Sequence, residues 1–141
     1  MKLEEKDLLL KDLCARLPYK PMVHAQWIYH ETDGSKKHKE ADRPLEINDF
    51  YAIWNVKPYL RSLSSMTEEE KEEFKARYFD LDESCEIDKD GDITFIGDND
   101  FITSSDLEIY FDFCNSHHFD YRGLIEKGLA LEAPEGMYKT E

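Results

Sequence analysis

The sequence has little cysteine and no long apolar run, and both shortages exclude classes of protein. Only Cys14, Cys85 and Cys114 occur in 141 residues, without a Cys-x-x-Cys spacing, which is typical of reduced thiols rather than a disulfide framework. No apolar run approaches the ~20 residues that cross a bilayer. The charged residues after Met1 do not fit a secretory signal. We therefore expect a cytoplasmic protein that does not bind a membrane.

Positive charge is also scarce. Eighteen Lys and Arg stand against thirty-two Asp and Glu, which gives a formal net charge of −14, and the basic residues are scattered. Proteins that bind nucleic acid through its phosphates need a basic patch or stripe. Direct nucleic-acid binding is therefore not expected.

Sequence motifs of catalysis are missing as well. There is no Gly-x-Ser-x-Gly, P-loop or Gly-x-Gly-x-x-Gly motif and no recognisable Cys–His–Asn arrangement. We therefore predict a protein that is not an enzyme and has no cofactor. A hydrolase of an unrecognised type, using the acidic residues at 98–100 or His117 and His118, remains an alternative.

Negative charge is abundant and concentrated in one third of the chain. Residues 68–112 contain seventeen Asp and Glu and four Lys and Arg, a net charge of −13, whereas the other ninety-six residues have a net charge of −1. The aromatic content of 13% is too high for a disordered acidic chain, and the length suits one domain with a real core. We predict a single domain over 1–141 with a strong local negative field.

The first half of the chain predicts a helix followed by strands. Apolar residues recur at helical spacing over residues 3–17, and Pro18 ends this pattern. Strict alternation predicts a strand at residues 22–30, and a second, less regular strand is expected at 45–53. The polar residues between them predict an exposed loop or a long hairpin tip. Pro58 argues against a central strand at 56–58.

The second half predicts helices around a hairpin. Thr67 with Glu70 forms the pattern of a capping box, which opens a helix over 67–79, and Phe74 with Tyr78 forms its core side. Asp90 before a glycine predicts a β-hairpin over 86–96. Further helices are expected at 105–116, buried on most sides, and at 120–127, where Gly128 would end the helix in a left-handed conformation. An extended tail follows, and we expect it to pack back on the body or on another protein. The fold class predicted is α+β, with a small, mainly antiparallel sheet and three or four helices.

One stretch resembles half of an EF-hand calcium loop. Glu86, Asp88 and Asp90 take the first, third and fifth ligand positions, and Gly91 takes the turn position. The twelfth position is Gly97 instead of a bidentate Glu. An acidic hairpin turn explains the same residues without a metal. A calcium-stabilised module that uses these carboxylates and Asp92 therefore remains an alternative, and the leading prediction contains no metal site.

Two further clusters have simpler structural explanations. Asp98, Asn99 and Asp100 could hold a divalent ion, but they lie where a turn is predicted, and Asp and Asn are ordinary turn residues. Adjacent histidines on a helix point about 100° apart, so His117 and His118 are poorly placed to chelate one ion together. A helix-terminal histidine at the negative end of the helix dipole is the preferred interpretation.

Three segments carry a resemblance to a known family. The segments at 58–70, 117–138 and 8–19 read PYLRSLSSMTEEE, HHFDYRGLIEKGLALEAPEGMY and LLLKDLCARLPY. They resemble the hallmark segments of a family of small uncharacterised proteins from gut Bacteroidales and their mobile elements, including prophages. That family has no assigned activity, so the resemblance implies a bacterial cytoplasmic context and an accessory role but no catalytic residue.

The charge distribution predicts a function in protein binding. We expect a non-enzymatic module that offers an acidic surface to a basic protein partner, as an inhibitor, a DNA mimic or an immunity-type protein would. Its oligomeric state is left open. The predicted partner-binding residues are the acidic side chains of the helix and hairpin, namely Glu68, Glu69, Glu72, Glu73, Asp88, Asp90, Asp92, Asp98 and Asp100.

Overall fold

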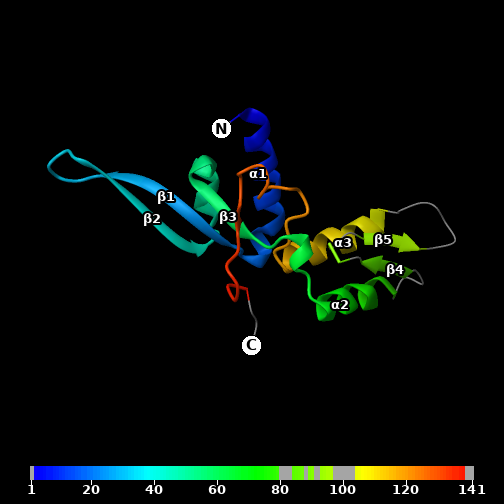
Figure 1. Ribbon diagram of the computed structural model, residues 1–141. Helices are drawn as coiled ribbons and strands as arrows, with labels where there is room; N and C mark the ends of the chain where they lie inside the picture. Colours follow the sequence, from blue (N-terminus) through cyan, green and yellow to red (C-terminus); the bar gives the residue numbers. More distant parts are fainter. Residues whose placement is uncertain (1, 80–83, 88, 91–92, 97–103, 139–141) are drawn as a thin grey trace. The chain divides into compact units, whose positions relative to one another are not determined.

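The computed structural model describes residues 2–79, 84–87, 89–90, 93–96 and 104–138 (Figure 1). The fold is α+β, as predicted. Within the described residues it contains three α-helices, three short 3-10 helices, a four-stranded sheet and a separate two-stranded hairpin. The chain forms two compact units. Unit 1 comprises Met1–Leu60 with Arg122–Glu141, and unit 2 comprises Arg61–Tyr121.

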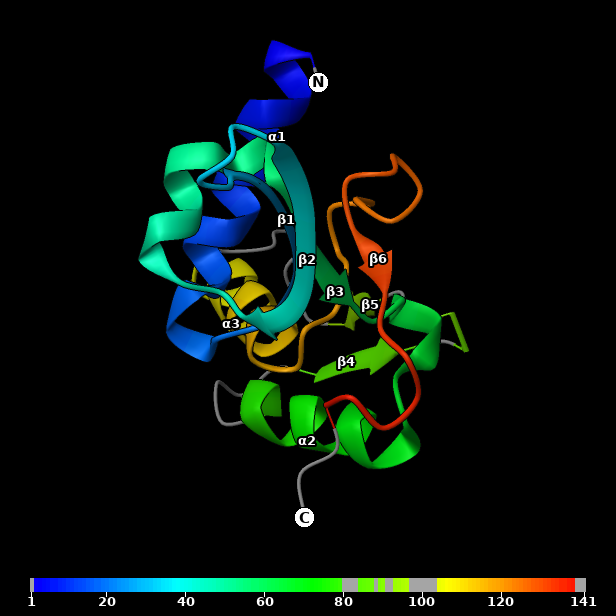
Figure 2. The ribbon, with the colours of Figure 1, turned by 90° about the vertical axis from the view of Figure 1, so that its left-hand side faces the viewer.

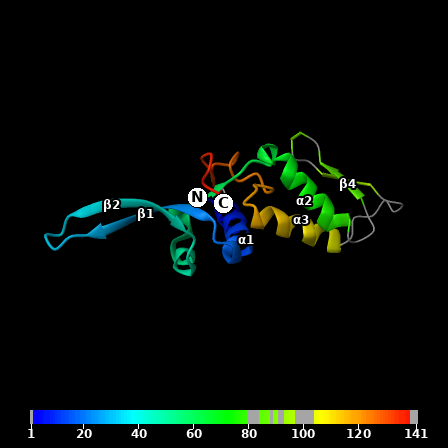
Figure 3. The same ribbon diagram turned by 90° about the horizontal axis from the view of Figure 1, so that it is seen from below.

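Unit 1 contains a long β-hairpin. Strand β1 (Met22–His30) has the predicted bounds and pairs antiparallel with β2 (Lys36–Pro44), from Met22 opposite Pro44 to His30 opposite Lys36. Figures 1 and 3 show the turn end of this hairpin extending beyond α1 of the same unit. The prediction of a loop or hairpin tip at 36–43 was wrong, because a mostly exposed strand has no apolar alternation to reveal it.

The predicted strand at 45–53 is instead a 3-10 segment, η2 (Ile47–Asn55), with a kink at Ala52. Its start is fixed by the carboxylate of Asp49, which accepts a hydrogen bond from the backbone N–H of Glu46 at 2.9 Å. The guanidinium of Arg43 donates to the same carboxylate, and this contact lowers the pKa of Asp49 although burial opposes the shift. These contacts outweigh the strand-like composition of the segment.

The sheet order is β2-β1-β3-β6. Strand β3 (Val56–Leu60) pairs antiparallel with β1, and β6 (Leu131–Glu132) pairs parallel with β3 at Tyr59 and Leu60. The argument from Pro58 against a central strand was therefore wrong. The proline is tolerated because β6 pairs with β3 only at Tyr59 and Leu60, which follow Pro58. On the β6 side of β3, no sheet hydrogen bond therefore needs the N–H that Pro58 lacks.

The core of unit 1 lies between the sheet and two helical segments. Helix α1 (Leu3–Arg16) continues into a 3-10 turn, η1 (Leu17–Tyr19), and contributes the fully buried Leu9 and Leu13. Figure 2 shows α1 and η2 side by side, on one side of the β1–β2 hairpin. Cys14 of the same helix is exposed.

The C-terminal segment packs back on unit 1, as predicted. Leu129 and Ala130 are buried, and the N–H of Ala133 donates to the carbonyl of Leu60 at 2.8 Å. Tyr138 ends the described chain between two strands, where its hydroxyl accepts from the N–H of Met22 at 2.8 Å and donates to the carbonyl of Tyr59 at 2.6 Å. Burial raises the pKa of Tyr138 to about 12.

We expect Tyr138→Phe to lower the free energy of unfolding by about 1–3 kcal/mol, because it removes the partner of two partly buried backbone groups. Urea unfolding of the full chain measures the change. Tyr51→Phe is the matched control, since the Tyr51 side chain is 85% exposed and its hydroxyl loss should cost less than about 0.5 kcal/mol. Equal stability of the two variants would contradict the role assigned to the Tyr138 hydroxyl.

Unit 2 consists of helices α2 (Glu68–Phe79) and α3 (Ser104–Ser116), the hairpin β4 (Ser84–Ile87) and β5 (Ile93–Ile96), and the 3-10 turn η3 (Leu63–Ser65). Helices α2 and α3 lie side by side (Figure 3). The core of this unit is formed by Met66, Phe74, Phe113, Cys114 and Phe119.

Two predictions for the second half of the chain need correction. Residues 120–127 form turns instead of a helix, although Gly128 has the predicted left-handed conformation with φ +75°. Helix α3 is not buried on most sides, since Glu108, Phe111 and Asp112 are exposed. Its many apolar residues had suggested a wider buried face.

Each unit has its own hydrophobic core among the described residues. The prediction of a single domain over 1–141 concerns whether the two units fold together, and it stays a prediction. None of the helices in the described part of the chain combines the length and apolar character needed to span a bilayer.

Candidate interaction surface on the acidic unit

The division of charge coincides with the division of the fold. Unit 2, residues 61–121, contains eighteen Asp and Glu and five Lys and Arg, a net charge of −13. Unit 1 contains the remaining fourteen acids and thirteen bases, a net charge of −1. The negative field predicted from the sequence therefore belongs to one compact body.

Helix α2 presents four of the predicted residues on one exposed face. At about 100° per residue, Glu68, Glu69, Glu72 and Glu73 fall within an arc of about 140°. All four are exposed, and 87% of the Glu68 side chain is accessible. Lys71 partly neutralises this face, because its Nζ lies 3.2 Å from the carboxylate of Glu68.

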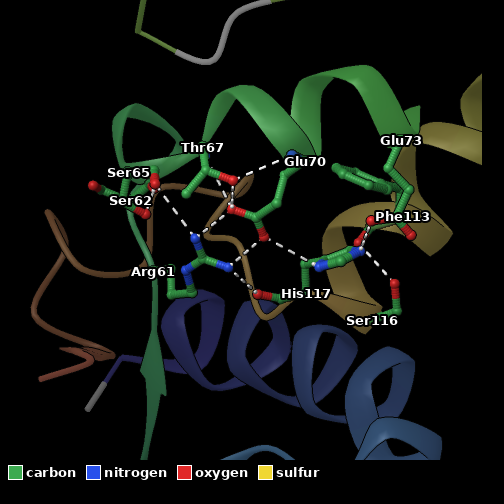
Figure 4. Close-up of polar contacts among 9 residues, drawn as sticks. All are labelled: Arg61, Ser62, Ser65, Thr67, Glu70, Glu73, Phe113, Ser116 and His117. Carbon is green, nitrogen blue, oxygen red and sulfur yellow. Dashed lines mark hydrogen bonds and ion pairs between the residues drawn. The ribbon is translucent and has the colours of Figure 1, made fainter. Parts of the chain in front are cut away.

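The opposite side of α2 is fixed by Glu70, whose carboxylate meets the guanidinium of Arg61 in a bidentate pair (Figure 4). Both N–O distances are 2.7 Å, and the two side chains are 15% and 21% exposed. The same carboxylate accepts from the backbone N–H of Thr67 at 3.0 Å, while the hydroxyl of Thr67 accepts from the N–H of Glu70. The capping box predicted at this helix start is thus confirmed, and an ion pair reinforces it.

Arg61 joins the start of α2 to the segment that follows α3. Its backbone N–H donates to His118 at 2.8 Å, and its carbonyl accepts from Asp120 at 2.7 Å. Its guanidinium lies 4.3 Å from the ring centroid of Phe119, a cation–π contact. These contacts hold α2 in one position within unit 2, so its four exposed glutamates are displayed on a fixed helix.

His117 links two glutamates of α2. Its Nδ1 lies 3.2 Å from Glu70, and its Nε2 lies 3.2 Å from Glu73 (Figure 4). Both ring nitrogens can donate to these carboxylates only when the ring is protonated. His117 follows the last residue of α3, as predicted, but its ring bridges two carboxylates of another helix, a role that the helix-dipole interpretation did not include.

The environment of Glu70 stabilises its charged form strongly. Hydrogen bonds from Arg61, His117 and the Thr67 backbone hold the pKa of Glu70 far below its ordinary value of 4.5, although partial burial acts in the opposite direction. Glu70 therefore remains a carboxylate at any physiological pH. The sequence identified Glu70 as a capping residue, but nothing in it identified Arg61 as its partner.

The remaining predicted residues belong in sequence to the β4–β5 hairpin and to the stretch that follows it. The hairpin itself is confirmed, with Ser84 opposite Ile96 and Ile87 opposite Ile93. Asp90 lies in its turn and is exposed. The other four predicted residues, Asp88, Asp92, Asp98 and Asp100, lie outside the described residues, as does Gly97 of the EF-hand-like pattern. The convergence of these acids with the α2 glutamates stays a prediction.

Other polar side chains among the described residues of unit 1 pair with one another. A cleft of about 250 Å³ in unit 1 has only Arg43 and Asp49 as charged lining residues, and they pair with each other. On the β1–β2 hairpin, His24 contacts Asp42 at 2.8 Å, which raises the pKa of the histidine. Among the residues that the structure describes, no three His, Cys, Asp or Glu side chains are grouped closely enough to hold a metal ion.

Comparisons with known proteins add no relative: no family model, no curated protein and no solved structure matches this chain.

Proposed function

We propose that this protein is a non-enzymatic binding module that offers the acidic unit 2 to a basic protein partner. The observation that carries the proposal is the concentration of a net charge of −13 in one compact unit, beside a unit of −1. Such a field attracts a cationic partner over about a Debye length and accelerates association. Because the charge is confined to one unit, it also orients the partner toward that unit.

The fixed outer face of α2 is the proposed centre of contact. Glu68, Glu69 and Glu72 extend into solvent, while Glu70 and Arg61 hold the inner face. A fixed helix loses little conformational freedom on binding, which favours affinity. The α2 carboxylates could occupy a partner's surface that normally binds nucleic-acid phosphates. They could equally bind a toxin whose active site is basic. We therefore propose an inhibitor, a DNA mimic or an immunity-type protein, acting in the bacterial cytoplasm as an accessory protein of a mobile element.

Two charge-matched variants test this proposal. The first replaces the α2 glutamates by glutamine at positions 68, 69, 72 and 73. The second makes the same replacement at four exposed glutamates of unit 1, Glu4, Glu126, Glu132 and Glu135. Each removes four negative charges, so only the position of the charge differs between them. Circular dichroism establishes that both variants are folded.

We expect immobilised protein to capture a basic partner at about 50 mM salt, with an affinity that falls at least about tenfold near 300 mM as the charges are screened. The α2 variant should lose the partner, and the unit 1 variant should retain it. Capture that is insensitive to salt, or lost equally in both variants, would contradict an acidic binding surface on unit 2.

A further inference from the structure

The outer edge of β2 is a feature of unit 1 that the acidic-surface proposal does not use. Strand β2 is the last in the sheet order β2-β1-β3-β6, so one of its edges carries no further strand among the described residues. The strand is nine residues long and mostly exposed. An open edge of this length presents a row of N–H and C=O groups, to which a strand of another chain can bond.

Two hydrogen bonds of the hairpin determine which residues of β2 face outward. The N–H of Glu31 donates to the carbonyl of Ser35 at 2.9 Å, and the N–H of Leu45 donates to the carbonyl of Pro21 at 2.8 Å. Because the bonding direction alternates along an antiparallel strand, odd-numbered residues of β2 bond to β1 and even-numbered residues direct their backbone groups outward. Four of these outward residues have no backbone hydrogen bond to the rest of the described chain: Lys36, His38, Glu40 and Asp42.

The charges along β2 favour one register for pairing with a second copy. In a two-fold antiparallel pair with its axis at Lys39, Lys36 lies opposite Asp42 of the second copy. In the same pair His38 lies opposite Glu40, and the symmetry repeats both contacts. An axis at His38 would instead place Lys37 opposite Lys39. An axis at Glu40 would place Glu40 opposite itself, and like charges directly opposite are unfavourable.

Contacts with β1 and β3 hold the acidic half of this edge in position. The Oδ1 atom of Asp42 accepts a hydrogen bond from Tyr59 at 2.9 Å and lies 2.8 Å from Nδ1 of His24. The Oε2 atom of Glu40 lies 3.3 Å from Nε2 of the same histidine. Among the described residues, these contacts use one oxygen of each carboxylate. Oδ2 of Asp42 and Oε1 of Glu40 can therefore accept from Lys36 and His38 of a second copy.

Lysines on an edge strand usually oppose pairing with another strand, but two of the three on β2 are bound within their own hairpin. The Nζ of Lys37 lies 3.0 Å from the carboxylate of Glu31, and the Nζ of Lys39 lies 4.9 Å from the ring centroid of Tyr29. Both partners lie across the hairpin from β2, so these two ammonium groups are directed away from its outer edge. The third lysine, Lys36, is the one that faces Asp42 of the second copy.

Antiparallel pairing also keeps the cores of the two copies of unit 1 apart. The turn end of the hairpin extends beyond α1 (Figures 1 and 3). The paired segment 36–42 is about 20 Å long at 3.4 Å per residue, and the two cores lie at its opposite ends. The four outward residues of each strand form about eight backbone hydrogen bonds in this arrangement.

From these observations we propose that two copies of this chain pair through the outer edges of β2, with the two-fold axis at Lys39. The dimer joins the two four-stranded sheets into one continuous sheet. Backbone hydrogen bonds supply the affinity, and the Lys36–Asp42 and His38–Glu40 contacts set the register. Such a dimer carries two acidic units, which increases the avidity for a partner with two basic sites.

Cysteine cross-linking tests the register. In a Cys14→Ser background, which removes an exposed thiol, Lys39→Cys places two thiols opposite each other at the axis. The Cα atoms of such a pair are about 4.5 Å apart, within the range of a disulfide. In the matched control Lys37→Cys, the two thiols are about 14 Å apart along the strands. Oxidised glutathione should cross-link the first variant and not the second. No cross-link at position 39, or equal cross-linking at both positions, would overturn the proposal.

A charge exchange tests the contact between His38 and Glu40. Light scattering of the full-length protein between about 1 and 200 μM should show a mass that rises toward about 33 kDa, twice the 16.7 kDa of the chain. Glu40→Lys and His38→Glu should each weaken the dimer at least about tenfold, because each removes the favourable contact twice. The double variant His38→Glu/Glu40→Lys restores opposite charges and should recover most of this loss.

Glu126→Lys is the matched control, since it makes the same charge change at an exposed glutamate of unit 1 outside the sheet. It should dimerise like wild type, and circular dichroism establishes that all variants are folded. A double variant as weak as the single ones, or a weakened control, would overturn the proposal. A wild-type chain that is monomeric at 200 μM would also overturn it and would leave the edge to a strand of another protein.

The dimer and the binding of a basic partner fail independently. The variants at positions 37–40 leave the acids of unit 2 unchanged, so capture of the partner should persist when only the dimer is lost. The glutamine variant of α2 leaves β2 unchanged, so it should dimerise like wild type even where it no longer captures the partner.

Discussion

Replacing Asp12 by asparagine is expected to lower the free energy of unfolding by about 3–5 kcal/mol. Asp12 and Arg16 are one turn apart on α1, and both are fully buried. The carboxylate lies 2.7 Å from Nε of Arg16 and 3.3 Å from Nε of Arg122, so one carboxylate neutralises two guanidinium groups. Asparagine keeps the shape but removes the negative charge that faces the buried Arg16.

The measurement is urea unfolding followed by tryptophan fluorescence, because Trp27 and Trp54 are the only tryptophans and both belong to unit 1. Asp7→Asn is the matched control. Asp7 is an exposed aspartate on the same helix, and its replacement should cost less than about 0.5 kcal/mol. If the Asp12 variant were as stable as the control, the buried pair would contribute nothing to unit 1.

The elements that sequence predicts well are those with local signals. Strand β1 has the predicted bounds because Val23 and Ala25 alternate with less buried neighbours. Helix α2 begins where Thr67 and Glu70 satisfy each other's backbone groups. In both cases the deciding contacts are close in sequence, so a pattern of a few residues contains them.

The elements that sequence predicts poorly depend on partners far along the chain or on no burial at all. Strand β2 is mostly exposed, and only its pairing with β1 makes it a strand. The 3-10 segment η2 depends on the carboxylate of Asp49, which is held by Arg43. Propensity alone favours a strand there, and tertiary contacts override it.

The candidate surface was predictable in part, because the exposed face of α2 follows from a local sequence pattern. With Phe74 buried in the core, the opposite side of α2 must face solvent, and the exposure of Glu68, Glu69, Glu72 and Glu73 follows from helical geometry. The anchoring of that helix was not predictable. It needs Arg61 before the helix and His117 after the next one, and no local pattern joins them.

The second large effect is expected for Glu70→Gln, which should lower the free energy of unfolding of unit 2 by about 2–3 kcal/mol. Glutamine still fits the capping box with Thr67, so the variant removes the charge and little else. Arg61 then loses its bidentate carboxylate, and His117 loses one of its two acceptors. The cost is smaller than for Asp12, because water reaches Arg61 and Glu70.

Glu69→Gln is the matched control for this variant. It removes a charge from the adjacent, exposed position of the same helix and should change stability by less than about 0.5 kcal/mol. Far-UV circular dichroism reports both units, whereas tryptophan fluorescence reports unit 1 alone. A Glu70→Gln variant that moves both signals together would show that the units unfold as one domain; a shift confined to circular dichroism would contradict the single-domain prediction.

The pH dependence of Glu70→Gln has a defined sign. The folded state holds the pKa of Glu70 far below 4.5, so the unfolded chain takes up this proton first as the pH falls. The stabilisation from Glu70 is therefore complete above about pH 5.5 and declines progressively below pH 4.5. In Glu70→Gln this part of the acid sensitivity should be absent, so the stability difference between the two proteins should shrink progressively from about pH 5 to pH 3. Parallel stability curves over that range would show that Glu70 titrates normally and that its pair with Arg61 does not stabilise unit 2.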